Sequence, residues 1–172
     1  MQNLILIGFM GAGKTSVGNC LAQESGMTFV DTDERIVAEQ GMEISAIFEK
    51  YGEPYFRDLE TALLERMQND TDHSVISVGG GMPVRERNRD LLRSLGCVVY
   101  LLASKETILG RVRNDGTRPM LSGENLETRV ERLMREREAL YREAAHLMIQ
   151  TDGYSVPEVA QMIRLEARKF GY

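Results

Sequence analysis

The residues with the clearest chemical role lie close to the amino terminus, where glycines are combined with one lysine and one hydroxyl side chain. Residues 8–15 read GFMGAGKT and fit the pattern GxxxxGK followed by Ser or Thr. Such glycines let the backbone curl around phosphates, while Lys14 can reach the β- and γ-phosphates and the Thr15 hydroxyl can bind Mg²⁺. The pattern predicts a site for ATP and Mg²⁺. We expect six consecutive residues to contact the nucleotide: Gly11, Ala12, Gly13, Lys14, Thr15 and Ser16.

The sequence on either side of this loop matches the prediction. An apolar run at 4–7 predicts a strand before it, and the pattern at 17–22 predicts a helix after it, whose amino terminus adds positive potential. A glycine-rich turn with a solvated lysine is the alternative, and this context disfavours it. GTPases, ATPases and small-molecule kinases all share the loop, so other residues must distinguish them.

Two carboxylates, Asp31 and Asp33, lie at the end of a second apolar run, 28–31. Residues two apart in an extended chain point the same way, so we expect both to face one side at the carboxyl edge of a sheet, with Thr32 facing the other. One carboxylate could organise the Mg²⁺ shell, and the other could orient or deprotonate an attacking hydroxyl. Taken alone, such a pair more often represents two solvated turn aspartates.

Arg137 is predicted to point inward from a helix. It shares a helical face with four apolar residues, Val130, Leu133, Met134 and Tyr141. An arginine on an inward face is costly unless it meets an anion, and its planar fork suits a carboxylate. A structural ion pair with an acidic side chain is the alternative.

Arg57 is interpreted in the same way, with Glu60 one turn later as a possible tether and a surface i,i+3 pair as the alternative. Three successive glycines, Gly79, Gly80 and Gly81, end the third apolar run. They indicate close approach of the backbone to a ligand, with a simple turn as the alternative.

Several separated motifs together resemble shikimate kinase, in their order and in their spacing. They are GFMGAGKT at 8–15, DTD at 31–33, GEPYFRDLE at 52–60, VGGG at 78–81, RPML at 118–121 and REALY at 137–141. The third apolar run also carries Ser77 where many NTPases have an aspartate, a departure that the family shares.

The resemblance implies roles for particular residues. Asp33 would contact the ring hydroxyls of shikimate as base or orienter, and Asp31 would support Mg²⁺ through water. Arg57 and Arg137 would bind the substrate carboxylate, and the Gly80 amide would face the substrate.

The segment 111–124 is polar, basic and interrupted by Gly116 and Pro119, which favours a mobile lid, although a solvated basic loop is the usual meaning of such a run. By resemblance, Arg118 would meet the transferring phosphoryl group, and Arg111 would lie against the adenine or the phosphates.

These residues require a scaffold, and the whole chain predicts an α/β fold. Five short apolar runs alternate with helical periodicity, at 3–7, 28–31, 74–78, 97–102 and 147–151. We expect a three-layer parallel sheet flanked by helices, in a phosphate-binding-loop kinase of the nucleoside-monophosphate-kinase type. One domain, 1–172, would carry a substrate-binding insertion near 33–62 and a lid near 111–124.

Composition limits the possible partners. The chain has 172 residues, 42% of them hydrophobic, and a net charge of -5, which argues against nucleic acid as the main partner. The first residues contain no basic segment before the glycine loop, so neither a signal peptide nor a membrane span is expected. The expectation is a cytoplasmic monomer.

The predicted reaction is phosphoryl transfer from MgATP to the 3-hydroxyl of shikimate. A gluconate or nucleoside-monophosphate kinase is the nearest alternative enzyme. A nucleotide-dependent regulatory protein that has lost catalysis is the alternative from another class, and the presence of Lys14, Asp33 and Arg118 together weighs against it.

Overall fold

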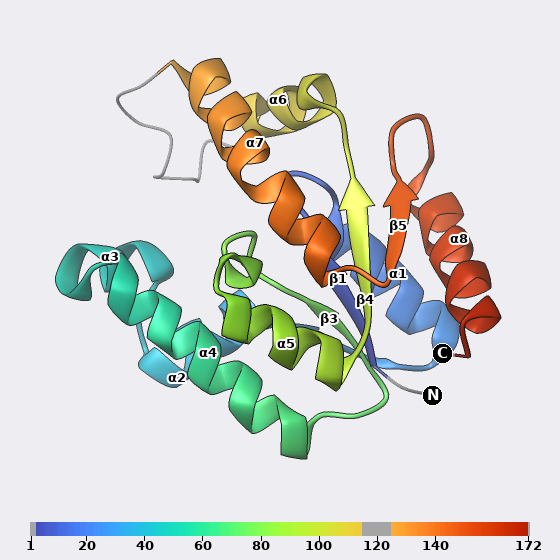
Figure 1. Ribbon diagram of the computed structural model, residues 1–172, viewed down its shortest axis with the longest axis horizontal. Coiled ribbons are helices and arrows are strands. Elements are labelled where there is room, and N and C mark those ends of the chain that lie inside the picture. Colours follow the sequence, from blue (N-terminus) through green and yellow to red (C-terminus); the bar gives the residue numbers. More distant parts are fainter. Residues whose placement is uncertain (1–2, 115–124, 172) are drawn as a thin grey trace.

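A computed structural model describes residues 3–114 and 125–171 of the chain. A parallel sheet with the strand order β2-β3-β1-β4-β5 forms its centre (Figure 1). The strands are β1 (Asn3–Ile7), β2 (Thr28–Asp31), β3 (Ser74–Ser77), β4 (Gly96–Leu102) and β5 (Leu147–Gln150). All five predicted strands are confirmed, with ends that differ by at most one residue.

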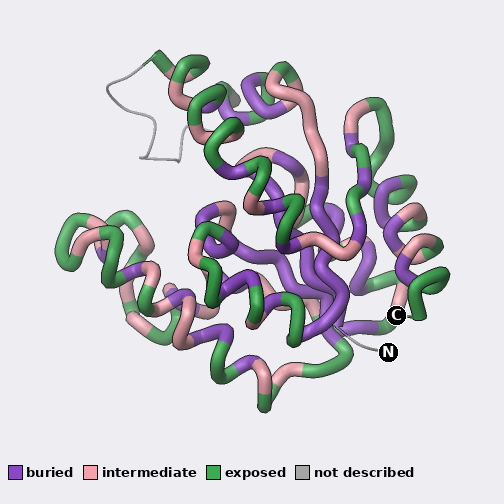
Figure 2. Tube along the Cα trace, viewed as in Figure 1, coloured by how far each residue is buried: buried purple, intermediate pink, exposed green. Residues whose placement is uncertain are grey.

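The central strands are apolar along their whole length because both faces of the sheet are covered. Every residue of β1 is buried, and the register places Leu4 beside Val75 and Cys97. Figure 2 shows this buried centre surrounded by helices whose outer sides are exposed. The apolar runs therefore lie where a parallel sheet requires them.

Helices form the outer layers of the molecule. They are α1 (Lys14–Ser25), α2 (Thr32–Gln40), α3 (Ile44–Tyr51), α4 (Glu53–Asp70), α5 (Glu86–Leu95), α6 (Lys105–Asn114), α7 (Leu126–Ala144) and α8 (Val156–Lys169), with a 3₁₀ turn η1 (Met82–Val84). In Figure 1, α5 and α7 cross in front of the sheet, whereas α1 lies behind it. The predicted α/β architecture is confirmed.

The long insertion after β2 forms a lobe of three helices beyond the β2 side of the sheet (Figure 1). Phe48 of α3 and Phe56 of α4 join two of these helices, with ring centroids 4.9 Å apart. Phe56 is buried in the common core, and α4 continues beside α5. The insertion is therefore attached to the main body through α4.

The last helix begins with a capping box, in which the Ser155 amide donates to the Glu158 carboxylate at 2.7 Å. Its buried face packs on α1 and β5. Val156 and Phe170, apolar residues at the two ends of this helix, are 37% and 64% exposed. Val156 is the first residue of α8 and Phe170 follows its last residue, so neither lies in the packed body of the helix.

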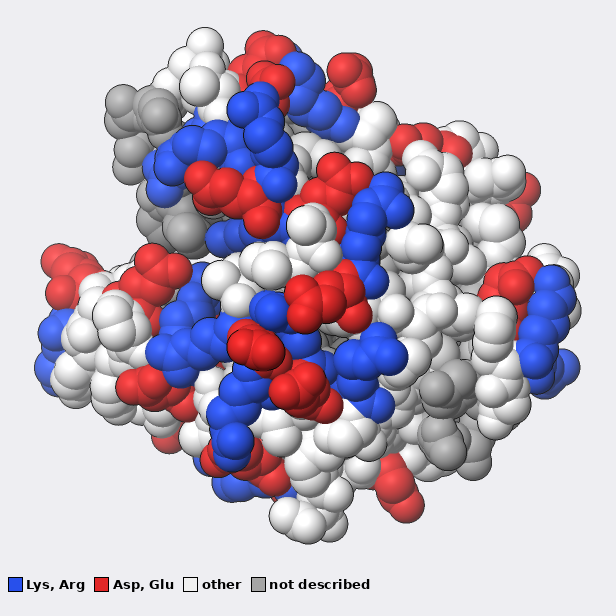
Figure 3. Space-filling view, viewed as in Figure 1, with Lys and Arg blue, Asp and Glu red and all other residues white. Residues whose placement is uncertain are grey.

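Charged side chains of both signs are interspersed over the face shown in Figure 3. Many of them form exposed ion pairs, such as Arg85 with Asp58 and Arg142 with Glu138. Exposed pairs of this kind contribute about 0–1 kcal/mol each. Within the described ranges, no helix has the length and hydropathy needed to cross a membrane.

Candidate active site

A cavity of about 980 Å³ lies at the carboxyl edge of the sheet. Its walls come from the loop after β1, the ends of β2 and β3, and helices α3, α4 and α7. Every predicted site residue in the described part of the chain lines this cavity: Gly11, Ala12, Gly13, Lys14, Thr15, Ser16, Asp31, Asp33, Arg57, Gly79, Gly80, Gly81, Arg111 and Arg137. Arg118 lies outside the described residues.

The glycine-rich loop connects β1 to α1 in a strongly curved conformation. Gly11 and Gly13 have φ angles of 77° and 95°, a left-handed region that favours glycine. The Lys14 ammonium donates hydrogen bonds to the carbonyl oxygens of Gly8 at 2.8 Å and Phe9 at 3.0 Å. The lysine side chain therefore folds back over the loop, at the amino terminus of α1, where an anion is favoured.

The two aspartates line the cavity, but not through the predicted strand alternation. β2 ends at Asp31, whose carboxylate accepts hydrogen bonds from the amides of Asp33 at 2.9 Å and Glu34 at 3.3 Å. Asp31 is thus the N-cap of α2, and Asp33 lies in its first turn. The prediction that both extend from a strand is wrong, because Asp31 ends β2 and caps α2, so Asp33 already lies in the helix.

Thr32, between the two aspartates, is fully buried and faces the glycine segment. Its hydroxyl oxygen accepts a hydrogen bond from the Gly79 amide at 3.2 Å. This contact joins the start of α2 to the segment after β3.

None of the three glycines has a positive φ, so backbone angle does not require them, and close packing does so only at Gly79 and Gly81. A Cβ atom on Gly79 would lie 2.7 Å from Asp33 Oδ1, and one on Gly81 would overlap the Arg57 guanidinium. The glycine segment thus packs tightly against side chains of the cavity. Its close approach to a ligand stays a prediction. The Gly80 carbonyl accepts a hydrogen bond from the Tyr141 hydroxyl at 2.6 Å.

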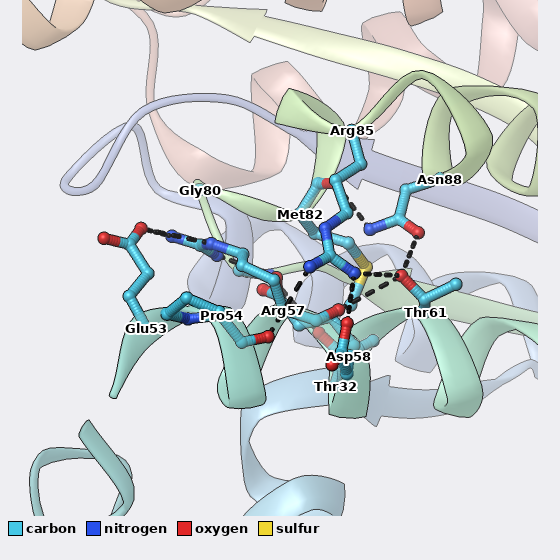
Figure 4. Close-up of polar contacts among 12 residues, drawn as sticks. Thr32, Glu53, Pro54, Arg57, Asp58, Thr61, Gly80, Met82, Arg85 and Asn88 are labelled. Atoms are coloured by element: carbon cyan, nitrogen blue, oxygen red, sulfur yellow. Dashed lines mark hydrogen bonds and ion pairs between the residues drawn. The ribbon is translucent and has the colours of Figure 1, made fainter. Parts of the chain in front are cut away.

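Arg57 and Glu60 form the predicted tether, with 2.7 Å between Nη1 and Oε2. It is not a surface pair, because the side chains are only 11% and 1% exposed. Arg57 forms a second ion pair with the exposed Glu53, with 3.0 Å between Nη2 and Oε1 (Figure 4). Burial raises the pKa of Glu60 to about 7, against the opposing effect of Arg57.

Arg137 is buried, which confirms the prediction from its helical face. Its guanidinium carbon lies 5.9 Å from the centre of the Phe9 ring, and it also interacts with Tyr141. No carboxylate among the described residues lies within ion-pair distance of Arg137. The alternative of a structural ion pair therefore has no partner in this part of the chain.

The predicted lid needs a correction at its amino-terminal end. Residues 111–114 belong to α6, and Val112 is buried, so this end is packed rather than loose. Arg111 donates a hydrogen bond from Nη1 to the Gly11 carbonyl at 2.7 Å. The apolar residues Ile108 and Val112, one turn apart, are the signal that the helix continues past residue 110.

Sequence reasoning missed several residues that line the cavity. Tyr154 and Val156 come from the segment after β5, and Ile44 and Phe48 come from α3. The segment after β5 could have been found, because the carboxyl ends of parallel strands share one edge. Ile44 and Phe48 lie within the predicted substrate-binding insertion near 33–62, but no local pattern singled out these two residues.

Comparison with known proteins gives one consistent family. The family model described as shikimate kinase matches residues 10–167. The chain is 43% identical over 163 residues to the shikimate kinase of Thermodesulfovibrio yellowstonii, covering 95% of this chain and 93% of the relative. It is 45% identical over 162 residues to that of Thioalkalivibrio sulfidiphilus, covering 94% and 85%.

Solved structures agree with this result. The shikimate kinase from Acinetobacter baumannii in complex with shikimate has a TM-score of 0.94 at 38% identity, covering 99% of this chain and 95% of that chain. A gluconokinase from Sinorhizobium meliloti has a TM-score of 0.62 at 17% identity, covering 98% and 95%, which shows the shared fold alone. The predicted fold class is confirmed.

Proposed function

This chain belongs to the shikimate kinase family, and we propose that it transfers the γ-phosphoryl group of ATP to the 3-hydroxyl of shikimate. The products would be shikimate 3-phosphate and ADP, within aromatic amino-acid biosynthesis. One observation carries the proposal: Arg57, Asp33 and Arg137 line the same cavity as the phosphate-binding loop. A carboxylate-bearing alcohol and a nucleoside triphosphate could therefore meet there.

The loop would bind the nucleotide. On binding, Lys14 would exchange the carbonyl oxygens of Gly8 and Phe9 for the β- and γ-phosphates. The exposed position of Arg111, hydrogen-bonded to Gly11, supports a contact with the adenine or the phosphates. Ser16 follows Thr15 in the first turn of α1, where free amides favour phosphate.

The donors at this end of the cavity fit Mg²⁺. Mg²⁺ prefers oxygen ligands, keeps several waters and is often held by few protein groups together with substrate phosphates. Thr15 would supply a hydroxyl oxygen, and Asp31 would act through water. Bound there, the ion would neutralise charge developing on the phosphates.

The other end of the cavity would hold shikimate. Arg57 and Arg137 would bind its carboxylate, the Gly79–81 segment would lie along it, and Asp33 would orient the attacking hydroxyl. In the transfer, the hydroxyl oxygen forms a bond to the γ-phosphorus and the bond to the ADP oxygen breaks. The hydroxyl proton passes to the Asp33 carboxylate. Positioning supplies much of the rate increase.

Arg118, outside the described residues, is proposed from the family resemblance to stabilise charge on the transferring group. A monomer is proposed because one chain supplies all the other residues assigned here. A cytoplasmic location is proposed because the reaction consumes ATP.

The test is an assay of ADP release with shikimate, gluconate and a panel of nucleoside monophosphates as acceptors. We expect turnover with shikimate and a 1:1 ratio of ADP to shikimate 3-phosphate. Turnover with gluconate or a nucleotide in its place would overturn the substrate assignment. ATP binding without transfer to any acceptor would favour a regulatory protein.

A further inference from the structure

Two adjacent buried residues of α5, Asn88 and Arg89, hold the turn that follows the glycine segment. Asn88 is fully buried and donates from Nδ2 to the Met82 carbonyl at 2.9 Å. Arg89, 8% exposed, donates to the carbonyls of Pro83 and Val84 at 3.0 Å each. These side chains thus satisfy all three carbonyl oxygens of η1, which starts directly after Gly81. The position of the turn depends on α5.

Asn88 also reaches the helix that carries Arg57. The Thr61 hydroxyl of α4 donates to Asn88 Oδ1 at 2.7 Å, and Thr61 lies one turn after Arg57 (Figure 4). The direction of the Asn88 amide is defined, because its Nδ2 already donates to Met82. Thr61 is therefore linked through a single buried side chain to the turn behind the glycines.

Arg89 reaches the helix that carries Arg137. Its Nη2 lies 3.3 Å from Glu143 Oε1 of α7. One turn later, Arg93 donates to the carbonyls of Glu143, Ala144 and Ala145 at the end of α7. In Figure 1, α5 lies between α4 and α7, so the two arginine-bearing helices are connected through it.

We propose that Thr61, Asn88 and Arg89 are positioning residues that set the separation of Arg57 and Arg137 across the substrate carboxylate. This inference rests on the proposed function. Apolar contacts between helices are non-directional, whereas a bidentate clamp must be held within about 0.5 Å. Directional hydrogen bonds that join Asn88 to α4 and Arg89 to α7 supply that accuracy.

The test is Thr61→Val, which keeps the shape of the side chain and removes the donor to Asn88. We expect the Kd for shikimate, measured by calorimetry, to rise about three- to thirtyfold, the range for residues that act through others. The Kd for ATP should stay unchanged. Thr61→Ser keeps the hydroxyl and should restore the shikimate affinity, which loss of packing alone would not predict.

The matched control is Gln68→Leu. Gln68 also joins α4 to α5, by donating to the Leu91 carbonyl at 3.0 Å, but it lies about 16 Å along α4 from Arg57. This variant should lower the Tm and leave the Kd for shikimate unchanged. A wild-type Kd for Thr61→Val, or an equal loss in Gln68→Leu, would overturn the positioning role alone. Failure of the wild-type chain to bind shikimate would overturn the proposed function with it.

Discussion

Arg57 and Arg137 differ in what a substrate carboxylate would displace. Arg57 is already paired with Glu53 and Glu60, whereas Arg137 has no carboxylate within ion-pair distance in the described ranges. An anion at Arg57 must compete with two glutamates. At Arg137 it meets a buried cation whose charge is costly to leave uncompensated. Arg137 should therefore contribute the larger share of the net affinity.

Arg137→Lys should weaken shikimate binding by about 1–3 kcal/mol, because lysine keeps the charge and loses the planar fork. The affinity for ATP should hardly change. Calorimetric titration with each ligand measures both effects, and a melting curve accompanies it. Unchanged shikimate affinity with a lowered Tm would show that Arg137 is structural.

Glu60 should make stability depend on pH. Burial raises its pKa from 4.5 to about 7, so the folded chain binds more protons than the unfolded chain between these values. The stability that Glu60 contributes is fully present below about pH 4.5 and is lost as the pH rises through about 7. Glu60→Gln cannot titrate and should lack this dependence.

Denaturant unfolding of wild type and Glu60→Gln at pH 5 and pH 8 measures this effect. The free energy of unfolding of wild type relative to the variant should be smaller at pH 8 than at pH 5. Parallel pH profiles for the two proteins would contradict the raised pKa.

Among the elements, the segment after β3 is shaped by the side chains packed against it. Thr32 accepts a hydrogen bond from the Gly79 amide, while Asp33 Oδ1 lies 2.7 Å from the place that a Cβ on Gly79 would take. Gly79→Ala should displace Asp33, because the added methyl group cannot fit at 2.7 Å. We expect kcat to fall at least about tenfold, as displacement of a reacting group by 1 Å can cost about a hundredfold.

The kinetics of Gly79→Ala are best compared with its ATP affinity, which should be retained. Gly110 of α6, which like Gly79 has no positive φ and has open space around it, offers a matched Gly→Ala control for expression and folding. Normal turnover in Gly79→Ala would show that Asp33 tolerates displacement and has no positional role.

The phosphate-binding loop acts as one element, in which Lys14 is held over the backbone by two carbonyl oxygens. Lys14→Met keeps the length of the side chain and removes its charge. Phosphoryl transfer should fall below detection in a coupled ADP-release assay, because no other side chain in the loop carries a positive charge. Near-normal turnover in the folded variant would refute the nucleotide assignment.

At the scale of the whole molecule, the cavity is lined by the sheet, by the inserted helices and by α7. A ligand bound there should stabilise all three together, since it binds only the folded chain. Shikimate at about 100 times its Kd should add about 2.7 kcal/mol to the free energy of unfolding. For a chain of this size, that corresponds to a rise in Tm of roughly 5–10 °C.

Thermal melts with shikimate and with gluconate test this expectation. The rise should occur with shikimate and be reduced in Arg137→Lys. Stabilisation by gluconate alone would point to the other kinase class.

The sequence by itself determined the strands, the glycine loop and the inward direction of Arg137. Each depends on local periodicity or on a short motif, and both kinds of signal are complete within a few neighbouring residues. The tether from Arg57 to Glu60 was predictable for the same reason, because residues three apart meet on one helix. The resemblance to a family added the substrate, which no local pattern specifies.

Only the tertiary structure decided how these parts meet. It showed that Asp31 caps α2, that Phe48 and Tyr154 line the cavity, and that no carboxylate in the described part of the chain lies within ion-pair distance of Arg137. Asn88 is the clearest case, since its two partners lie 6 and 27 residues away and no periodicity links them. Contacts between distant segments depend on how the helices pack on the sheet, and local sequence does not encode that packing.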